Sequence, residues 1–240
     1  MIYVMSDIHG NLRRFESVLK QIDLKSDDTL YILGDVIDRH PDGIRILRRI
    51  MATPNMKMLL GNHEYMMLRA LGEPYDPADR GRDLNLEECL RLWYRNGGGV
   101  THRHLKHLRK TLRSEICSYL QALPLNIDVE LNGRFYKLVH GAPVDQFRYC
   151  TEYFHNRTHY AVWKRWQYSD ELPGYYTMVF GHTPTRHYQP NCPMRIYYAP
   201  SRIGIDCGSG YPEDPAYEHH VYGRLACLRL DDMREFYSEE

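Results

Sequence analysis

The sequence lacks a surplus of charge of either sign, because its 31 lysines and arginines equal its 31 aspartates and glutamates. Proteins that bind nucleic acid without sequence preference usually carry an excess of basic residues, so the composition argues against a general nucleic-acid-binding protein. The sequence also lacks any apolar run close to the ~20 residues that a membrane-spanning helix requires. We therefore expect neither a nucleic acid nor a membrane as a partner.

A disulfide framework is also missing from the sequence. The six cysteines are scattered and form no Cys-x-x-Cys pair, as is typical of reduced thiols in a cytosolic protein. The chain starts with the apolar segment Ile2-Tyr3-Val4-Met5, with no basic region or cleavage site before it, and we expect a cytoplasmic protein. Internal repeats and low-complexity linkers are lacking as well. The 240 residues, 43% of them apolar, fit one large α/β domain over residues 1–240.

The first third of the chain alternates between short apolar segments and segments with helical periodicity. We predict strands at residues 2–6, 29–33 and 56–60. Helices are expected after Asn11, a plausible N-cap, after Pro41, and at residues 65–71. Repeated β-α-β units of this kind indicate a mainly parallel sheet.

The second half of the sequence is richer in predicted strands. Asn132-Gly133 separates two apolar runs, at residues 125–131 and 134–139, and is the strongest short signal for a β-hairpin. Further strands are predicted at residues 177–180, 195–198, 203–206 and 222–230.

Residues 72–115 interrupt this pattern, and we predict that they form a helical insertion near the active site. The segment contains Gly97-Gly98-Gly99 and a dense cationic run. The run could contact a phosphopeptide or a polyphosphate, although we favour a solvated helix face balanced by Asp83, Glu87 and Glu88. Its cationic residues are His102, Arg103, His104, Lys106, His107, Arg109, Lys110 and Arg113.

Five short polar motifs follow apolar runs in a fixed order. They supply carboxylates, an amide oxygen and imidazoles, which are ligands that Mn²⁺, Fe²⁺ and Zn²⁺ accept. The carboxyl ends of strands in open α/β sheets form ligand crevices, so residues distant in sequence can converge there. The motifs are Asp7-Ile8-His9, Gly34-Asp35-Val36-Ile37-Asp38-Arg39, Gly61-Asn62-His63-Glu64, His140-Gly141 and Gly181-His182-Thr183.

The spacing of these residues predicts a site for two metal ions. Asp7 and His9 stand at positions i and i+2, so in an extended segment both point to the same side. The Asp35 carboxylate can bridge metals ~3.5–4 Å apart, and the metals would make a bridging water into the hydroxide nucleophile. The second metal's ligands would be completed by Asn62, His140 and His182. Each motif alone has a structural alternative, such as a helix N-cap for Asn62, but the ordered set favours metal binding.

Three residues of the motifs remain for handling a phosphate. Arg39 can fork onto two phosphate oxygens. His63 could protonate the leaving oxygen as a general acid, and Asp38 could hold His63 protonated. The ordered motifs therefore predict a two-metal phosphoester hydrolase.

The motifs resemble those of the calcineurin-like metallophosphoesterase superfamily, and above all the PPP-type serine/threonine protein phosphatases of bacteria and phages. The resemblance runs from Asp7 to the segment ending at Gly208. It implies an α/β fold with two mixed β-sheets packed as a sandwich and flanked by helices. It also implies an acid pair of Asp38 and His63. The implied metal ligands are Asp7, His9 and Asp35 for the first ion, and Asp35, Asn62, His140 and His182 for the second.

The resemblance implies two phosphate-binding arginines, with Arg39 as the first. Arg165 follows Trp163-Lys164 and matches the family's pattern for the second, although it could instead be a surface arginine on an amphipathic helix. We expect two divalent ions, Mn²⁺ in the first place, with iron or zinc as alternatives. The oligomeric state is not assigned by the sequence.

Two departures from the family pattern bear on the substrate. Leu60 stands where the protein phosphatases usually have an arginine, and His40 where they have a glycine. Leu60 favours the related symmetrical diadenosine tetraphosphate hydrolases, whereas Glu64 favours the protein phosphatases. We rank a serine/threonine protein phosphatase first, acting on a phosphorylated protein or small phosphoester. A dinucleoside polyphosphate hydrolase ranks second and a non-catalytic scaffold last; a narrow cleft could also accept phosphotyrosine.

Overall fold

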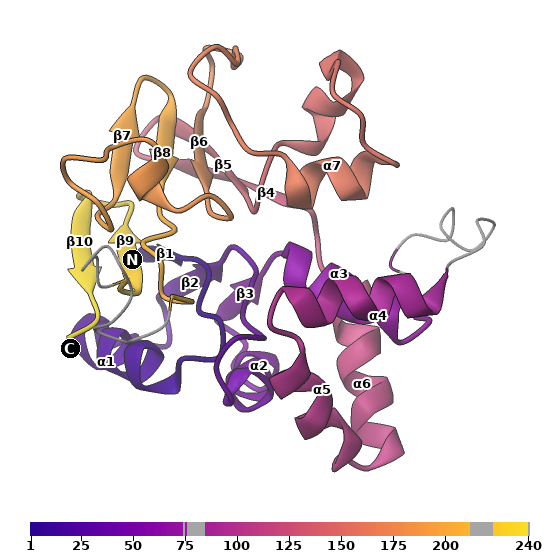
Figure 1. Ribbon diagram of the computed structural model, residues 1–240. Helices are drawn as coiled ribbons and strands as arrows, with labels where there is room; N and C mark the ends of the chain where they lie inside the picture. Colours follow the sequence, from indigo (N-terminus) through magenta and orange to yellow (C-terminus); the bar gives the residue numbers. More distant parts are fainter. Residues whose placement is uncertain (74, 76–84, 212–222, 240) are drawn as a thin grey trace.

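The computed structural model describes residues 1–73, 75, 85–211 and 223–239, and its described part contains two five-stranded β-sheets (Figure 1). The first sheet has the strand order β10-β9-β1-β2-β3. Its central strands β1, β2 and β3 are parallel, and β9 and β10 continue the sheet in antiparallel pairing. The strands are β1 (Ile2–Met5), β2 (Thr29–Ile32), β3 (Met56–Met58), β9 (Ala226–Arg229) and β10 (Arg234–Tyr237).

The second sheet has the order β4-β5-β6-β8-β7. A hairpin joins β4 to β5 around Asn132-Gly133, β5, β6 and β8 are parallel, and β7 is antiparallel to β8. Both sheets are therefore mixed, as the family resemblance implied. The strands are β4 (Asn126–Leu131), β5 (Arg134–Val139), β6 (Thr177–Phe180), β7 (Tyr197–Ala199) and β8 (Arg202–Gly204).

An apolar layer between the two sheets joins them into a sandwich. Val4 from the first sheet belongs to the same buried cluster as Leu138 and Val179 from the second. Its neighbours Tyr3 and Met5 belong instead to the cluster under the helices, because successive side chains of a strand point to opposite faces. Both faces of the first sheet are thus covered, which explains why β1 is apolar throughout.

Helices cover the outer face of the first sheet and share one large apolar cluster with it. In Figure 1, α4, α5 and α6 lie beside this helical layer, at the end of the first sheet nearest β3. One further helix and two short 3-10 helices connect the strands of the second sheet. The helices are α1 (Leu12–Ile22), α2 (Gly43–Met51), α3 (Asn62–Ala70), α4 (Leu86–Arg95), α5 (Gly99–Lys106), α6 (Lys110–Gln121), α7 (Arg157–Trp163), η2 (Val144–Tyr149) and η3 (Thr185–His187).

Several predicted boundaries differ from those observed. The Asn11 N-cap is present, since its side chain accepts a hydrogen bond from the Arg14 amide. The helix expected at 65–71 begins at Asn62 with Gly61 as its N-cap, which places Asn62, His63 and Glu64 in its first turn. The cationic run between His102 and Arg113 does not form one helix, because α5 ends at Lys106 and α6 begins at Lys110.

The C-terminal part of the chain departs further from the prediction. The strand β10 was not predicted; Met233, with a φ of 61°, precedes it. Residue 222 of a predicted strand, and Asp83 of the expected acidic balance, lie outside the described residues. Within the described ranges, no helix is both long enough and apolar enough to cross a bilayer.

Candidate metal centre

The loops that follow β1 and β2 leave their strands through left-handed backbone conformations. The φ angles of Asp7, His9 and Asp35 are 55°, 50° and 54°, a region that residues other than glycine seldom adopt. Two hydrogen bonds fix the loops to each other, from the Asp7 amide to Gly34 O (3.2 Å) and from the His9 amide to Asp35 O (2.9 Å). The assumption of an extended Asp7-x-His9 segment was therefore wrong. Loop pairing brings Asp7 Oδ1 within 3.8 Å of His9 Nε2.

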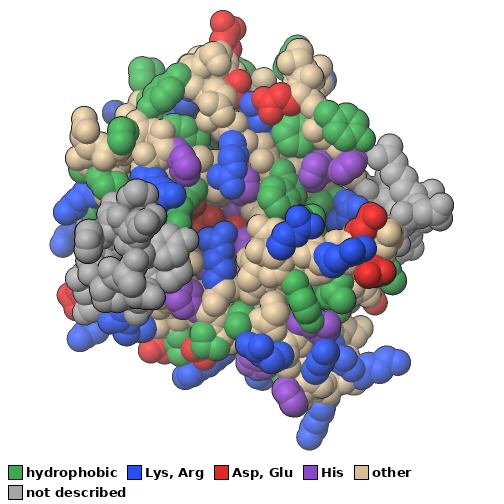
Figure 2. All heavy atoms as spheres, viewed as in Figure 1, with side chains coloured by type: hydrophobic (Ala, Val, Ile, Leu, Met, Phe, Trp, Pro, Cys, Tyr) green, Lys and Arg blue, Asp and Glu red, His purple; other side chains and the backbone are tan. Residues whose placement is uncertain are grey.

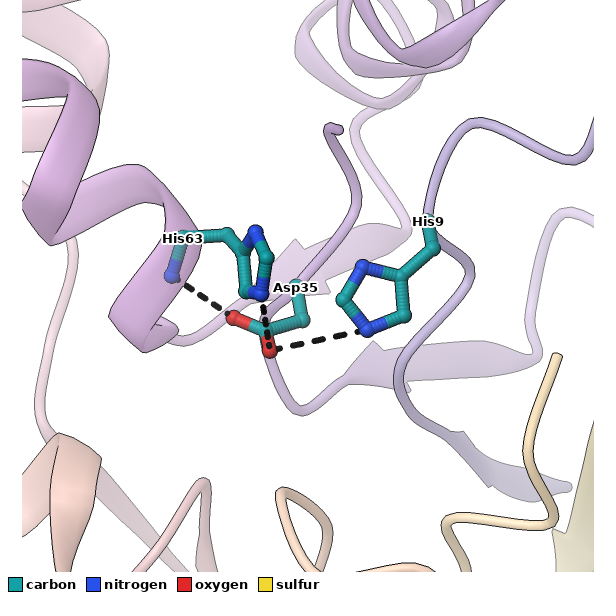
Figure 3. A group of neighbouring side chains, drawn as sticks. All are labelled: His9, Asp35 and His63. Atoms are coloured by element: carbon teal, nitrogen blue, oxygen red, sulfur yellow. Dashed lines mark hydrogen bonds and ion pairs between the residues drawn. The ribbon is translucent and has the colours of Figure 1, made fainter. Parts of the chain in front are cut away.

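The Asp35 carboxylate lies between two groups of potential ligand atoms, and Figure 3 shows the first of them, with His9 and His63. Its Oδ2 is 3.8 Å from His9 Nε2 and 3.9 Å from His63 Nε2. Its Oδ1 faces the other way, 3.5 Å from His140 Nε2, and accepts the His63 backbone N–H at 3.0 Å. In each group, His9–Asp35–His63 and Asp35–His140–His182, the ligand atoms lie within 4.8 Å of one another. One carboxylate thus belongs to both groups.

Asn62 completes the second group from the start of α3. Its Oδ1 lies 2.9 Å from His140 Nε2 and 2.8 Å from His182 Nδ1. The helix start at Asn62 and the ends of β5 and β6 therefore bring one amide oxygen and two imidazole nitrogens to one point. The sequence-based expectation that these three residues converge agrees with this geometry.

Three of the histidines are oriented by backbone carbonyls, which leaves their other ring nitrogen directed at the site. A ring nitrogen that donates to a carbonyl carries the proton, so the opposite nitrogen can bind a cation. Burial lowers the pKa of His9 and of His182 well below the usual value, which keeps both rings neutral. The pairs are His9 Nδ1 with Ile37 O (3.3 Å), His140 Nδ1 with Leu33 O (2.7 Å) and His182 Nε2 with Trp163 O (3.1 Å).

Three carboxylates are buried in the same place. Burial raises the pKa of Asp7 and, more strongly, that of Asp206. Burial opposes ionisation of Asp35 too, but His140 and His63 outweigh it and lower the Asp35 pKa. Buried carboxylates need nearby positive charge, so this set of oxygen and neutral nitrogen donors fits divalent cations. Sequence reasoning did not single out Asp206 as a site residue.

His63 and Asp38 form a buried pair next to the first group. His63 Nδ1 lies 2.7 Å from Asp38 Oδ2. Burial opposes protonation of His63, but the nearby Asp35 and the hydrogen bond to Asp38 outweigh it and raise its pKa. A protonated imidazole does not bind a metal, so His63 suits a proton donor better than a ligand. Arg39 Nη2 lies 3.4 Å from His63 Nε2, at the open side of the pair.

The 72–115 segment contacts this pair through two residues that sequence reasoning missed. Trp93 Nε1 in α4 donates to Asp38 Oδ2 at 2.8 Å, and Thr101 Oγ1 in α5 accepts from the Asp38 amide at 3.0 Å. No sequence signal separates Trp93 from an ordinary core tryptophan, because its partner lies 55 positions away.

A cleft of about 1240 Å³ opens above these residues. In the middle of the face shown in Figure 2, acidic and histidine side chains lie in a hollow beside Lys and Arg side chains. The cleft walls contain three arginines, Arg39, Arg95 and Arg165. They also include the aromatic residues Trp163, Trp166, Tyr168, Tyr188 and Tyr211.

The residues whose roles the sequence left open are now placed. Arg165 is exposed and lies just beyond the end of α7, so it does not belong to that helix. It lines the cleft, where its Nη1 donates to His182 O at 3.0 Å. His40 also lines the cleft. Leu60 is fully buried in the apolar cluster under the helices and is not among the described residues that line the cleft.

Glu64 is wholly buried and organises the loop that carries Asp35. Its two carboxylate oxygens accept from four backbone amides. Burial raises its pKa to about 7, whereas the four donors favour the ionised form. Glu64 therefore supports the Asp35 loop from behind the site, and it is not among the described residues that line the cleft. The amides belong to Asp35, Val36, Ile37 and Gly61.

A family model described as calcineurin-like phosphoesterase matches residues 1–206. The chain is 44% identical over 71 residues to the symmetrical bis(5'-nucleosyl)-tetraphosphatase of Delftia acidovorans, covering 29% of this chain and 25% of the relative. It is 36% identical over 92 residues to the protein of that name from Legionella pneumophila, covering 37% and 32%. The match thus spans between a quarter and a third of these relatives.

Solved structures share the fold across nearly the whole chain. A protein serine/threonine phosphatase from Saccharomyces cerevisiae superposes with a TM-score of 0.59 at 12% identity, covering 100% of this chain and 79% of that one. A candidate diadenosine tetraphosphatase gives a TM-score of 0.57 at 18% identity, covering 98% and 91%. At these identities the likeness concerns the fold alone.

Proposed function

The chain belongs to the calcineurin-like phosphoesterase family, and on this premise we propose that it is a two-metal hydrolase that cleaves dinucleoside polyphosphates symmetrically. The metal part of the proposal rests on the Asp35 carboxylate, whose two oxygens face separate groups of ligand atoms. A single-metal site would have no need for this arrangement.

The proposed ligands divide around Asp35. Asp7, His9 and Asp35 would hold the first ion. Two divalent ions, Mn²⁺ by preference, would act as Lewis acids on phosphate oxygens and lower the pKa of water for the attack. The ligands of the second ion would be Asp35, Asn62, His140 and His182.

The other polar residues of the cleft handle the substrate in this proposal. Arg39 and Arg165 would hold phosphate oxygens, since both line the cleft, Arg39 beside His63 and Arg165 beside His182. His63 would keep a proton on Nε2 and transfer it to the leaving oxygen. Asp38, bonded to His63 Nδ1, would hold the ring in position for that transfer.

The substrate ranking from the sequence is reversed. Its argument for a protein phosphatase was Glu64, which is buried behind the site and contacts loop amides. The curated relatives are named as symmetrical bis(5'-nucleosyl)-tetraphosphatases. The cleft is large and its aromatic walls offer faces on which nucleobases can stack. These observations favour a dinucleotide over a phosphorylated peptide.

A substrate comparison tests the proposal. Metal-loaded protein is given diadenosine tetraphosphate, phosphoserine and phosphotyrosine peptides, and p-nitrophenyl phosphate. We expect kcat/KM to be roughly a hundredfold higher for the dinucleotide than for either peptide, with ADP as the only nucleotide product. ATP with AMP would reject symmetrical cleavage, and preference for a peptide would restore the phosphatase ranking. If no substrate is turned over and no metal binds, the chain is a non-catalytic scaffold.

A further inference from the structure

The backbone at Asp38 and Arg39 is held by Gly97, which lies between α4 and α5, and by Thr101 in α5. Asp38 and Arg39 have φ angles of 72° and 67°, so both lie in a conformation that needs support from outside the loop. Thr101 Oγ1 accepts from the Asp38 amide at 3.0 Å. Gly97 O accepts from the Arg39 amide at 3.2 Å. The 72–115 segment therefore stabilises the backbone of this loop through two hydrogen bonds.

Trp93 adds a contact to the Asp38 side chain. Trp93 is the only fully buried residue of α4, and its indole N–H donates to Asp38 Oδ2 at 2.8 Å. The same oxygen faces His63 Nδ1. Asp38 Oδ1 is buried and has no hydrogen-bond partner among the described residues. The orientation of the carboxylate thus depends on the two contacts that share Oδ2.

The glycines after α4 make room for the indole. A Cβ on Gly98 would lie 2.4 Å from Trp93 Nε1 and from Cδ1, closer than a Cβ contact allows. The backbone of Gly98 therefore packs directly on the edge of the ring that carries the N–H. This close approach fixes the indole against Asp38. It also explains why a glycine stands at position 98.

We propose that Trp93 is a positioning residue for proton delivery: its indole N–H fixes the Asp38 carboxylate, which in turn holds His63 toward the leaving oxygen. This inference rests on the proposed role of His63 as the acid. Trp93 does not touch the cleft in this scheme. It acts through Asp38, and α4 thereby contributes to the chemistry without supplying a reacting group.

Dependence on the leaving group provides the test. A poor leaving group needs protonation and a good one does not, so a misplaced acid slows only the former. For Trp93→Phe we expect kcat on phenyl phosphate to fall at least about tenfold, while kcat on p-nitrophenyl phosphate changes less than about twofold. The KM values and the metal content should stay as in the wild type.

Matched variants separate the possible failures. Tyr94→Phe removes a hydroxyl on the same helix that contacts His102, and it should show no leaving-group bias. His63→Asn should show a larger bias than Trp93→Phe. If His63→Asn shows none, the proposed acid is wrong and the role of Trp93 fails with it. If His63→Asn shows the bias and Trp93→Phe matches Tyr94→Phe, only the inference about Trp93 is overturned.

The contact between Trp93 and Asp38 can also be tested by NMR spectroscopy without replacing Trp93. The indole proton resonance of Trp93 should move upfield in Asp38→Ala, because the carboxylate acceptor is lost. The Trp166 indole, which donates to Gly141 O, serves as the internal reference and should not move. A Trp93 resonance that stays in place in Asp38→Ala would overturn the proposal.

Discussion

The strand-end side of the cleft and the α4–α5 side hold their polar groups by different means. On the strand-end side, the candidate ligands come from loops that are bonded to neighbouring loops, except for Asn62 in the first turn of α3. His9, His140 and His182 are fixed by backbone carbonyls. On the α4–α5 side, a single buried indole and a glycine turn reach across to Asp38 and Arg39. The first side holds the residues that would bind metals, and the second supports Asp38 and Arg39, for which we propose roles in proton transfer and phosphate binding.

The largest effect is expected from replacing Asp35, the proposed bridging residue on the strand-end side. Asp35→Asn replaces one carboxylate oxygen by an amide nitrogen and removes the negative charge that both proposed ions would share. We expect metal analysis to show loss of both ions, and turnover of diadenosine tetraphosphate to fall by roughly a thousandfold or more. Asp232→Asn, at an exposed surface ion pair, is the matched control. Normal loading of two ions in Asp35→Asn would exclude the bridge.

Replacement of His63, the proposed proton donor, should lower turnover without changing the metal content. For His63→Asn we expect kcat to fall about 10²–10⁴-fold, with both ions still present in metal analysis. This outcome would separate the two sides of the cleft functionally. Loss of an ion together with the activity would instead make His63 a ligand of the first group, as its distance of 3.9 Å to Asp35 Oδ2 permits.

The support behind the strand-end loops can be removed at Glu64. Glu64→Ala leaves four buried amides without an acceptor. We expect the free energy of unfolding to fall by about 3 kcal/mol or more, measured by urea denaturation of the metal-free protein. Glu64→Asp should lose less, since it keeps the charge on a shorter side chain, and the exposed Glu115→Ala should be neutral. Equal stability of Glu64→Ala and wild type would mean that the loops hold themselves.

The pH dependence of kcat should follow the protonation of His63. Its pKa is raised above 6.5 by Asp35 and Asp38 against the effect of burial, so the protonated form persists above pH 6.5 and is lost as the pH rises through the raised pKa. We expect kcat on diadenosine tetraphosphate to decline on that alkaline limb in a pH profile. The limb should be missing in His63→Asn, and an identical limb in both proteins would assign it to another group.

The smallest effect is expected at the basic run on the outer surface of the α4–α5 side. Lys106 and Arg109 are exposed, and we interpret their neighbourhood as a solvated helix face. The double variant Lys106→Gln/Arg109→Gln should change kcat/KM by less than about twofold and the free energy of unfolding by about 0.5 kcal/mol or less. A tenfold loss of kcat/KM for the dinucleotide alone would show that the run contacts the substrate.

On the strand-end side, sequence reasoning placed Asp7, Asp35 and His140 at the ends of predicted apolar strands, because each lies within two residues of such a strand. Asp7, Asp35 and His140 could be placed from local pattern alone, and the parallel strands bring them to one edge of the sandwich. The left-handed loops at Asp7 and His9 were not predictable, since they depend on pairing with the loop after β2.

Trp93 and Thr101 on the α4–α5 side, and the orientation of Leu60 and Glu64, were not predicted for a different reason. Trp93 and Thr101 matter through contacts with Asp38, which lies 55 and 63 positions away in the chain. Leu60 and Glu64 were interpreted as substrate markers because their motif position is visible in the sequence, whereas the direction of their side chains is not. Both face away from the cleft, into the core and into the loop amides.

The start of α3 has a consequence for how such a protein can change over time. Three consecutive residues of one helical turn point three ways: Asn62 toward the second ligand group, His63 toward Asp38, and Glu64 toward the loop of Asp35. A small rotation of this turn would disturb all three at once, so none can be tuned by moving the backbone. Adaptation to a new substrate is therefore easier through side chains on the cleft walls and the α4–α5 connection, where single replacements leave the turn in place.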